Sequence, residues 1–202
     1  MVAPTAASSA TPGPTTTSPN DARARLVALL AARSARRGTF TLASGRTSSL
    51  YIDARLTTMS PDGLALVGPL GLATCDSAGW APDAVGGLTL GADPVSYAVA
   101  YASALAGRAV RAFTVRKEPK QHGAGRLIEG PFRAGDRVVV VEDVITTGGS
   151  ARRAVEAVRA ADGVVVGVLA VVDRDEGGRE ALQALGLPVR ALATAGEIVA
   201  AM

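Results

Sequence analysis

Several runs of apolar residues, most of them rich in valine, follow one another from residue 84 onward. The four clearest occupy residues 84–88, 109–115, 137–143 and 163–173, and a fifth is possible at 188–193. Apolar positions in them are continuous and do not alternate with polar ones, which is typical of strands covered on both faces. Helical patterns separate the runs at residues 92–105, 150–161 and 176–185. This alternation predicts an α/β fold, with a parallel central sheet flanked by helices.

The stretch before residue 80 has a different pattern. Leucines spaced along one face predict a helix over residues 21–37, capped by Asp21. Residues 38–56 indicate two short strands joined by a turn. A second helix is expected over residues 60–78, with Pro61 in its first turn, where proline is well tolerated. These elements predict a small unit ahead of the main sheet.

Composition adds limits to this picture. The chain has 202 residues, 48% of them hydrophobic, which is enough for one domain with a sizeable core. Residues 1–20 are rich in Ala, Pro, Ser and Thr, so we expect a disordered tail before a domain at 21–202. No apolar run approaches the ~20 residues that span a bilayer, so no membrane partner is expected. The single cysteine, Cys75, excludes an internal disulfide and fits a reducing cytoplasm, and we expect it buried on a helix.

The sequence VVVVEDVITTGGS, residues 138–150, holds the first candidate site. Two acids, Glu142 and Asp143, stand near the end of a predicted strand, where parallel sheets bind ligands. Residues 146–150 then supply hydroxyls and unhindered backbone N–H groups at the start of a helix, a good phosphate cradle. Carboxylates accept hydrogen bonds from sugar hydroxyls, so the pair of features predicts a ribose 5′-phosphate ligand. Neither GxxxxGK[ST] nor GxGxxG follows a strand here, which disfavours nucleotide hydrolases and dinucleotide enzymes.

A second candidate site lies at residues 115–130. This segment holds Lys117 and Lys120, the only lysines of the chain, and His122, its only histidine. The length of this loop after a strand, and the clustering of charge in it, suggest a lid that closes over a polyanion and excludes water. A solvated charged loop is the alternative that fits the same residues.

The first motif resembles the phosphoribosyl-pyrophosphate (PRPP) signature of type I phosphoribosyltransferases: an apolar run, two acids, two further residues, then Thr-Thr-Gly and a small residue. This resemblance implies that Glu142 and Asp143 hold the ribose hydroxyls and that residues 146–150 wrap the 5′-phosphate. The residues that it implies for PRPP binding, with those of the lid, are Arg116, Lys117, Lys120, His122, Glu142, Asp143, Val144, Ile145, Thr146, Thr147, Gly148, Gly149 and Ser150.

Three further stretches resemble orotate phosphoribosyltransferases: a hood motif at 40–53, the lid at 116–130 and the segment 171–178. Together with the PRPP motif the resemblance covers roughly residues 22–195 in the right order. It implies a type I phosphoribosyltransferase fold with an N-terminal hood, mainly residues 21–60. The implied reaction converts orotate and PRPP to orotidine 5′-monophosphate and pyrophosphate.

The same resemblance implies roles and partners. Lys117, Lys120 and His122 would be catalytic, and Thr146 and Arg174 would bind orotate. The implied assembly is a homodimer whose lid reaches into the neighbouring subunit. Magnesium is expected as the cofactor, carried mainly on the pyrophosphate rather than by protein ligands.

Some positions depart from the family pattern or allow another interpretation. Many members carry lysine where this chain has Ala43, and a Tyr-Lys pair where it has Leu90 and Gly91. Arg46, or backbone N–H groups around Gly91, could replace part of that charge; weakened or lost activity is the alternative. For Arg174 the alternative to orotate binding is a surface ion pair with Asp173 or Asp175. Tyr51 and Ile52 should pack on the orotate ring, with a core role as the alternative for Ile52.

Two other functions compete. A phosphoribosyltransferase of the same fold could act on a purine base, and a non-catalytic regulator could sense PRPP and bind nucleic acid. The net charge of +3 is small and dispersed, so no nucleic-acid partner is expected.

Overall fold

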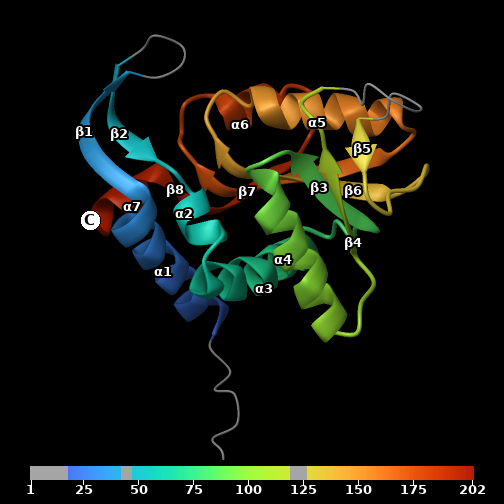
Figure 1. Ribbon diagram of the computed structural model, residues 1–202, viewed down its shortest axis with the longest axis horizontal. Coiled ribbons are helices and arrows are strands. Elements are labelled where there is room, and N and C mark those ends of the chain that lie inside the picture. Colours follow the sequence, from blue (N-terminus) through green and yellow to red (C-terminus); the bar gives the residue numbers. More distant parts are fainter. Residues whose placement is uncertain (1–17, 42–46, 119–126) are drawn as a thin grey trace, which may run out of the picture.

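A six-stranded sheet forms the centre of the protein, with strand order β5-β4-β3-β6-β7-β8 (Figure 1). The computed structural model describes residues 18–41, 47–118 and 127–202. Its sheet strands are β3 (Ala84–Leu88), β4 (Arg111–Val115), β5 (Ile128–Glu129), β6 (Arg137–Ile145), β7 (Val164–Asp173) and β8 (Val189–Thr194). Neighbouring strands pair in parallel, except that β5 runs antiparallel to β4. The predicted α/β fold and all five predicted strands are therefore confirmed.

Helices cover both faces of the sheet. On one face lie α1 (Pro19–Leu29), α3 (Pro61–Ser77) and α4 (Ala92–Leu105); on the other lie α5 (Gly149–Ala160) and α6 (Gly178–Gln183) (Figure 1). Alternate valines of β6 explain this arrangement: Val139 and Val141 pack into the first layer, and Val138 and Val140 into the second. All four are fully buried, and each burial is worth roughly 1.5–3 kcal/mol. A continuous apolar strand such as β6 therefore packs against hydrophobic side chains on both faces of the sheet.

The N-terminal helix differs from the prediction at both ends. Its cap is Ser18, whose Oγ accepts a hydrogen bond from the Asp21 N–H at 3.1 Å, so Asp21 lies in the first turn and is not the cap. Pro19 and Asn20 are helical and do not belong to a tail, whereas residues 1–17 lie outside the described residues. After α1 comes a π-helical turn, η1 (Leu30–Ser34), and the helix ends there instead of at residue 37.

Pairing with a second strand ends that helix. Ala35 pairs with Ile52 in an antiparallel two-stranded sheet of β1 (Ala35–Thr41) and β2 (Thr47–Ile52). Both strands of the hairpin agree with the prediction, and the turn between them lies outside the described residues. The hairpin stands beside α7 (Ala195–Ala200), apart from the central sheet (Figure 1).

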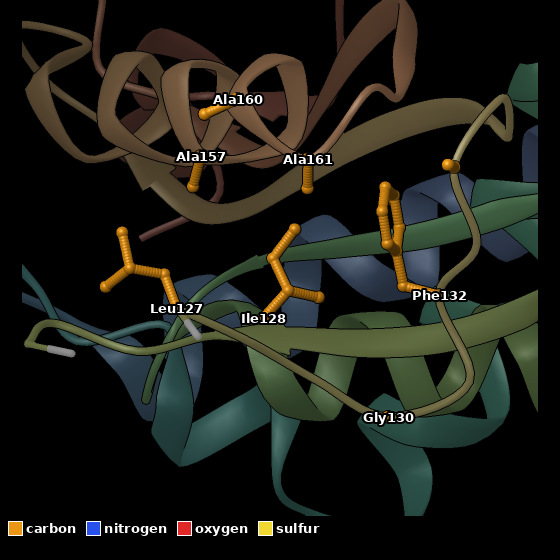
Figure 2. Close-up of a pocket in the computed structure, with 8 residues that line it drawn as sticks. Leu127, Ile128, Gly130, Phe132, Ala157, Ala160 and Ala161 are labelled. Carbon is orange, nitrogen blue, oxygen red and sulfur yellow. The ribbon is translucent and has the colours of Figure 1, made fainter. Parts of the chain in front are cut away.

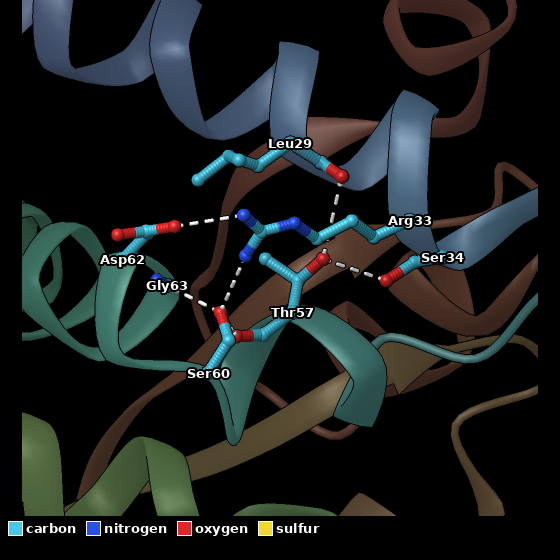
Figure 3. A network of polar contacts seen from close by, with 7 residues as sticks. All are labelled: Leu29, Arg33, Ser34, Thr57, Ser60, Asp62 and Gly63. Atoms are coloured by element: carbon cyan, nitrogen blue, oxygen red, sulfur yellow. Dashed lines mark hydrogen bonds and ion pairs between the residues drawn. The ribbon is translucent and has the colours of Figure 1, made fainter.

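A polar network fixes the hairpin relative to the helical layer. Figure 3 shows Arg33 reaching from η1 to Asp62, at 2.7 Å, and to Ser60 Oγ, at 3.1 Å. Beside it, the hydroxyls of Ser34 and Thr57 share a buried 2.7 Å hydrogen bond (Figure 3). Ser60 also caps α3, because its Oγ accepts a hydrogen bond from the Gly63 backbone N–H at 3.1 Å. The network joins η1 to α2 (Arg55–Thr58) and to the start of α3.

The sequence did not reveal three short elements, β5, α2 and α7. Cys75 is buried within α3, as predicted. Across the described ranges, no helix has the length and apolar character needed to cross a membrane.

Candidate active site

A cavity of about 320 Å³ opens at the carboxyl ends of β3, β6 and β7. Five separate parts of the chain meet there: the end of β2 with the start of α2, the loop after β3, the segment after β4, the end of β6 with the loop into α5, and the residue that follows β7. The lining residues are 51–55, 88–91, 142–144, Lys117, Thr146, Ser150 and Arg174. The cavity therefore gathers most of the predicted site residues that the structure describes.

A second cavity of about 350 Å³ adjoins it, lined by the loop that leads into α5. It shares Glu142, Val144, Thr146 and Ser150 with the first cavity, so one ligand can occupy both. The residues that line it are Glu142, Val144, Ile145, Thr146, Thr147, Gly148, Gly149, Ser150, Arg152 and Arg153. Together the two cavities form one elongated site with a helix N-terminus at one end.

Two glycines shape the loop at that end. Gly148 has φ +80°, a left-handed conformation that a side chain disfavours, and it stands immediately before α5. A Cβ at Gly178 would lie 2.4 Å from the carbonyl oxygen of Thr146, so only glycine lets α6 support the loop this closely. The backbone N–H groups at the start of α5 are thereby presented as an anion site.

Of the two acids, Glu142 lines both cavities and Asp143 lines the first. Glu142 is 6% exposed, and its Oε2 has no hydrogen-bond partner among the described residues. Burial raises the pKa of the Glu142 carboxyl well above its ordinary value, and the charge of Asp143 adds to this shift. Both acids belong to the last residues of β6, since that strand continues to Ile145, two residues beyond its predicted end. A buried, unsatisfied acceptor at this place suits a ligand that donates hydroxyl hydrogens.

The loop between β3 and α4 forms the far wall of the first cavity. It includes a cis peptide bond between Thr89 and Leu90. Asp93 organises the loop, because its carboxylate accepts from Thr89 Oγ1 at 2.6 Å and from Thr114 Oγ1 at 2.8 Å. A Cβ at Gly91 would lie 2.4 Å from Asp143 Oδ1, so this wall closely approaches the acids. No role for Asp93 was predicted from the sequence.

Arg174 reaches across from the end of β7 to the hairpin. Its Nη2 donates to Ser48 Oγ at 3.1 Å and to the Leu50 carbonyl oxygen at 3.0 Å. The ion pair that it makes is with Glu176, at 2.8 Å, and its side chain is only 7% exposed. The surface pair with Asp173 or Asp175 is therefore absent, and Asp173 binds Arg179 instead, at 2.6 Å. A nearly buried guanidinium lines the cavity where the base was predicted to bind.

Tyr51 and Ile52, the two residues expected to pack on the orotate ring, lie in different surroundings. Tyr51 is 40% exposed, lines the cavity and packs on Phe40 with ring centroids 5.4 Å apart. Ile52 is buried in the core layer of α1 and α3, so its core role is confirmed, although it also lines the cavity.

The predicted lid is only partly described. Arg116 pairs with Glu129 at 3.3 Å, whereas Lys117 is exposed and lines the first cavity. Lys120 and His122 lie outside the described residues. The same holds for Ala43 and Arg46. Another cation, Arg55, lies in the cavity and was not foreseen.

A larger cavity, of about 570 Å³, lies between β5 and the second half of α5 (Figure 2). Its walls carry no ionisable or hydroxyl side chain; they consist of Leu127, Ile128, Gly130, Phe132, Ala134, Ala157, Ala160 and Ala161. Volume alone therefore does not mark the site: this larger cavity lacks groups able to bind a sugar phosphate, whereas the smaller pair of cavities carries them.

Comparison with known proteins agrees with this geometry. Residues 72–183 match the phosphoribosyl transferase domain family. An orotate phosphoribosyltransferase of Aquifex aeolicus (strain VF5) is 44% identical over 176 residues, 87% of this chain and 95% of that protein. The crystal structure of the Mycobacterium tuberculosis H37Rv orotate phosphoribosyltransferase with Fe(III) dicitrate superposes with a TM-score of 0.78 at 45% identity, covering 88% of this chain and 98% of the other.

The Mycobacterium tuberculosis enzyme has also been solved in complex with PRPP. That structure superposes with a TM-score of 0.74 at 43% identity, and it covers 88% of this chain and 99% of its own. Sequence identity, coverage and fold agree over most of the chain. The chain therefore belongs to the orotate phosphoribosyltransferases, within the phosphoribosyl transferase family.

Proposed function

We propose that this protein transfers the phosphoribosyl group of PRPP to orotate, giving orotidine 5′-monophosphate and pyrophosphate. The observation that carries the proposal is the continuity of the site. An anion-binding loop, two acids and a nearly buried guanidinium line one elongated cavity, in that order. Relatives that are 44–47% identical over most of their length have the same activity.

The order of groups along the cavity orients PRPP. Residues 146–150 bind the 5′-phosphate at the start of α5, and Glu142 and Asp143 accept hydrogen bonds from the ribose hydroxyls. The unsatisfied Glu142 Oε2 supports this placement, because a ribose hydroxyl would supply the missing donor. The 1-diphosphate then extends toward the loop at 89–91 and Lys117.

The chemistry is a substitution at C1 of the ribose. The C1–O bond to the diphosphate breaks, its electron pair leaves with pyrophosphate, and a ring nitrogen of orotate forms the new bond to C1. The proton of that nitrogen passes to pyrophosphate or to water. Positive charge on the sugar and negative charge on the leaving group both grow, so Asp143 and the lid cations Lys117, Lys120 and His122 act mainly in the transition state.

Orotate differs from a purine in carrying a carboxylate. We assign that carboxylate to Arg174, whose guanidinium can hold two carboxylate oxygens, with Thr146 beside it. The low exposure of the Arg174 side chain supports the assignment, since a desolvated cation favours an anionic base over a neutral purine. Glu176 and the hairpin keep the guanidinium in place until the base arrives.

Magnesium fits this site as a companion of the diphosphate. The described residues include no group of three or more His, Cys, Asp or Glu side chains able to hold a metal ion by themselves. Oxygen ligands suit magnesium, and the Asp143 carboxylate lines the cavity toward the diphosphate end. The bound ion would neutralise charge on the leaving group.

We also propose a cytoplasmic homodimer in which the lid reaches the partner's site. A groove of about 590 Å³ between α3 and α4 supports a subunit interface, since it is lined mainly by apolar side chains. Leu64, Tyr101 and Leu105 are 37%, 67% and 72% exposed there. An unpaired buried thiol at Cys75 fits a reducing compartment.

The decisive experiment follows orotate absorbance with PRPP and Mg²⁺. We expect PRPP-dependent loss of orotate and none of adenine or hypoxanthine under the same conditions. Turnover of a purine alone would support the rival enzyme. Specific nucleic-acid binding at physiological salt, without turnover of any base, would support the regulator.

A further inference from the structure

Arg55 is a cation at the end of the cavity that lies away from the 5′-phosphate loop. It lines the cavity together with Leu90, Gly91 and Asp143, but it is absent from the neighbouring cavity of the 5′-phosphate loop. Arg55 and Leu90 also border an adjoining hollow, which places the guanidinium beside the loop between β3 and α4.

Asp53 holds this guanidinium in a fixed orientation. Arg55 Nε donates to Asp53 Oδ1 at 2.8 Å, and Nη2 donates to Oδ2 at 3.0 Å. The Arg55 backbone N–H also donates to Oδ1, at 3.2 Å. These bonds engage one edge of the planar fork, and no bond of Nη1 to another described residue is recorded. An arginine fixed along one edge is preorganised to bind an anion with the rest of its donors.

The shape of PRPP assigns a ligand to that end. The 5′-phosphate and the 1-diphosphate are attached at opposite ends of the ribose. With the phosphate on residues 146–150 and the hydroxyls on Glu142 and Asp143, the diphosphate must lie beyond the acids. Arg55 and Lys117 are the lining cations that remain for the diphosphate, because Arg174 is assigned to the orotate carboxylate.

Position 91 supplies no charge, because it is a glycine. A Cβ there would meet all three carboxylate atoms of Asp143, at 2.4–2.6 Å, so a side chain at this position would require the carboxylate to move. A cation that serves the diphosphate therefore has to come from another element, and α2 begins with one at the same cavity.

We propose that Arg55, fixed by Asp53, is a binding residue for the 1-diphosphate of PRPP and for the pyrophosphate product. The inference rests on the proposed function, since it names the group that holds the leaving end of that substrate. Because the diphosphate gains charge as the C1–O bond breaks, Arg55 stabilises the transition state as well as the bound substrate.

The test compares Arg55→Gln with Arg25→Gln, which removes an equal charge from an exposed position on α1. Ligand affinities are measured by calorimetry with PRPP, pyrophosphate and ribose 5-phosphate, each with Mg²⁺, and KM values for PRPP and orotate by absorbance. Arg55→Gln should weaken PRPP and pyrophosphate roughly 10- to 100-fold, the scale of charge-assisted hydrogen bonds. Ribose 5-phosphate, which lacks the diphosphate, and orotate should change less than about threefold.

Unchanged affinity for both PRPP and pyrophosphate would overturn the assignment. So would an equal loss for ribose 5-phosphate, which would indicate general damage to the site. If Arg55→Gln does not fold, Arg55→Lys tests the same point, with an intermediate loss for the two diphosphate ligands alone. Calorimetry measures binding without turnover, so it tests Arg55 separately from the reaction. A protein that binds PRPP and pyrophosphate through Arg55 but does not convert orotate would contradict the proposed function and still support the role of Arg55.

Discussion

Arg153 Nη2 donates a 2.7 Å hydrogen bond to the backbone carbonyl oxygen of Lys117. This bond joins the helix behind the 5′-phosphate loop to the first residues of the lid. Arg153 also lines the cavity of that loop, so one side chain contacts both parts of the PRPP site. We expect the phosphate end and the lid to depend on each other through it.

Arg153→Ala should raise the KM for PRPP about 3- to 10-fold, because an exposed hydrogen bond of this kind is worth ~0.7–1.4 kcal/mol. Initial rates at varied PRPP provide the measurement. The matched control is Arg152→Ala, which removes a neighbouring arginine that lines the same cavity. The side chain of Arg152 makes an exposed ion pair with Glu156, at 3.7 Å. Equal effects of the two substitutions would refute the special role of Arg153.

Gly91→Ala should lower kcat/KM for PRPP at least about tenfold. The added methyl group would lie 2.4 Å from Asp143 Oδ1, so either the carboxylate or the loop must move. Overpacking of this kind typically costs 1–3 kcal/mol. Gly196→Ala is the control, because a Cβ there meets no atom closer than 3.9 Å. Wild-type kinetics in Gly91→Ala would mean that the loop or the Asp143 carboxylate can move to accept the methyl group without affecting PRPP.

Arg174→Ala should raise the KM for orotate roughly 10- to 100-fold, the value of charged hydrogen bonds to a carboxylate. Its contacts to Ser48 and Leu50 also hold the hairpin, so some loss of thermal stability is expected as well. Arg190→Ala, at an exposed residue on the edge strand β8, controls for the loss of charge. An unchanged orotate KM, measured with saturating PRPP, would move the base to another part of the cavity.

The central sheet could be predicted because its strands carry their own signal. The apolar run at 84–88 corresponds to β3 with the same bounds. Every residue of β3 is buried, so its apolar pattern could be recognised without knowing which strands lie beside it. Residues 35–37 show the opposite case. Arg36 and Arg37 are good helix formers, but pairing of Ala35 with Ile52 overrides their local preference. Strand β5 has two residues and exists only through β4, so no local pattern could reveal it.

The site was predictable where it is continuous in sequence. The acids and the phosphate loop lie within one motif, whereas Arg55 and Asp93 depend on how distant elements meet. In the sequence, Asp93 is an ordinary acid in the first turn of a helix. Its role becomes clear only in the structure, where Thr89 and Thr114 both donate hydrogen bonds to its carboxylate. The helix α7 could have been found, because Thr194 and Glu197 form a capping box that is visible in the sequence.

Glu142→Gln should separate stability from function. In the free protein, burial and Asp143 raise the pKa of Glu142, so the native state binds its proton more tightly than the unfolded state. Stability is then lost as pH rises from the ordinary glutamate value, 4.5, through the raised native pKa. A neutral glutamine avoids that loss, so the variant should melt higher than the parent at pH 8. Each kcal/mol is worth about 2–4 °C for a protein of this size.

The gain should vanish near pH 4, where the parent carboxyl is protonated in both states. Thermal unfolding without ligand at the two pH values provides the measurement, and Glu156→Gln, at a site 65% exposed, should show no such dependence. PRPP binding should weaken in the same variant, because glutamine is a poorer acceptor for ribose hydroxyls. A melting temperature that is unchanged at pH 8 would mean that Glu142 is ionised without penalty. The raised pKa would then be refuted, and the loss of PRPP affinity alone would test the contact of Glu142 with the sugar.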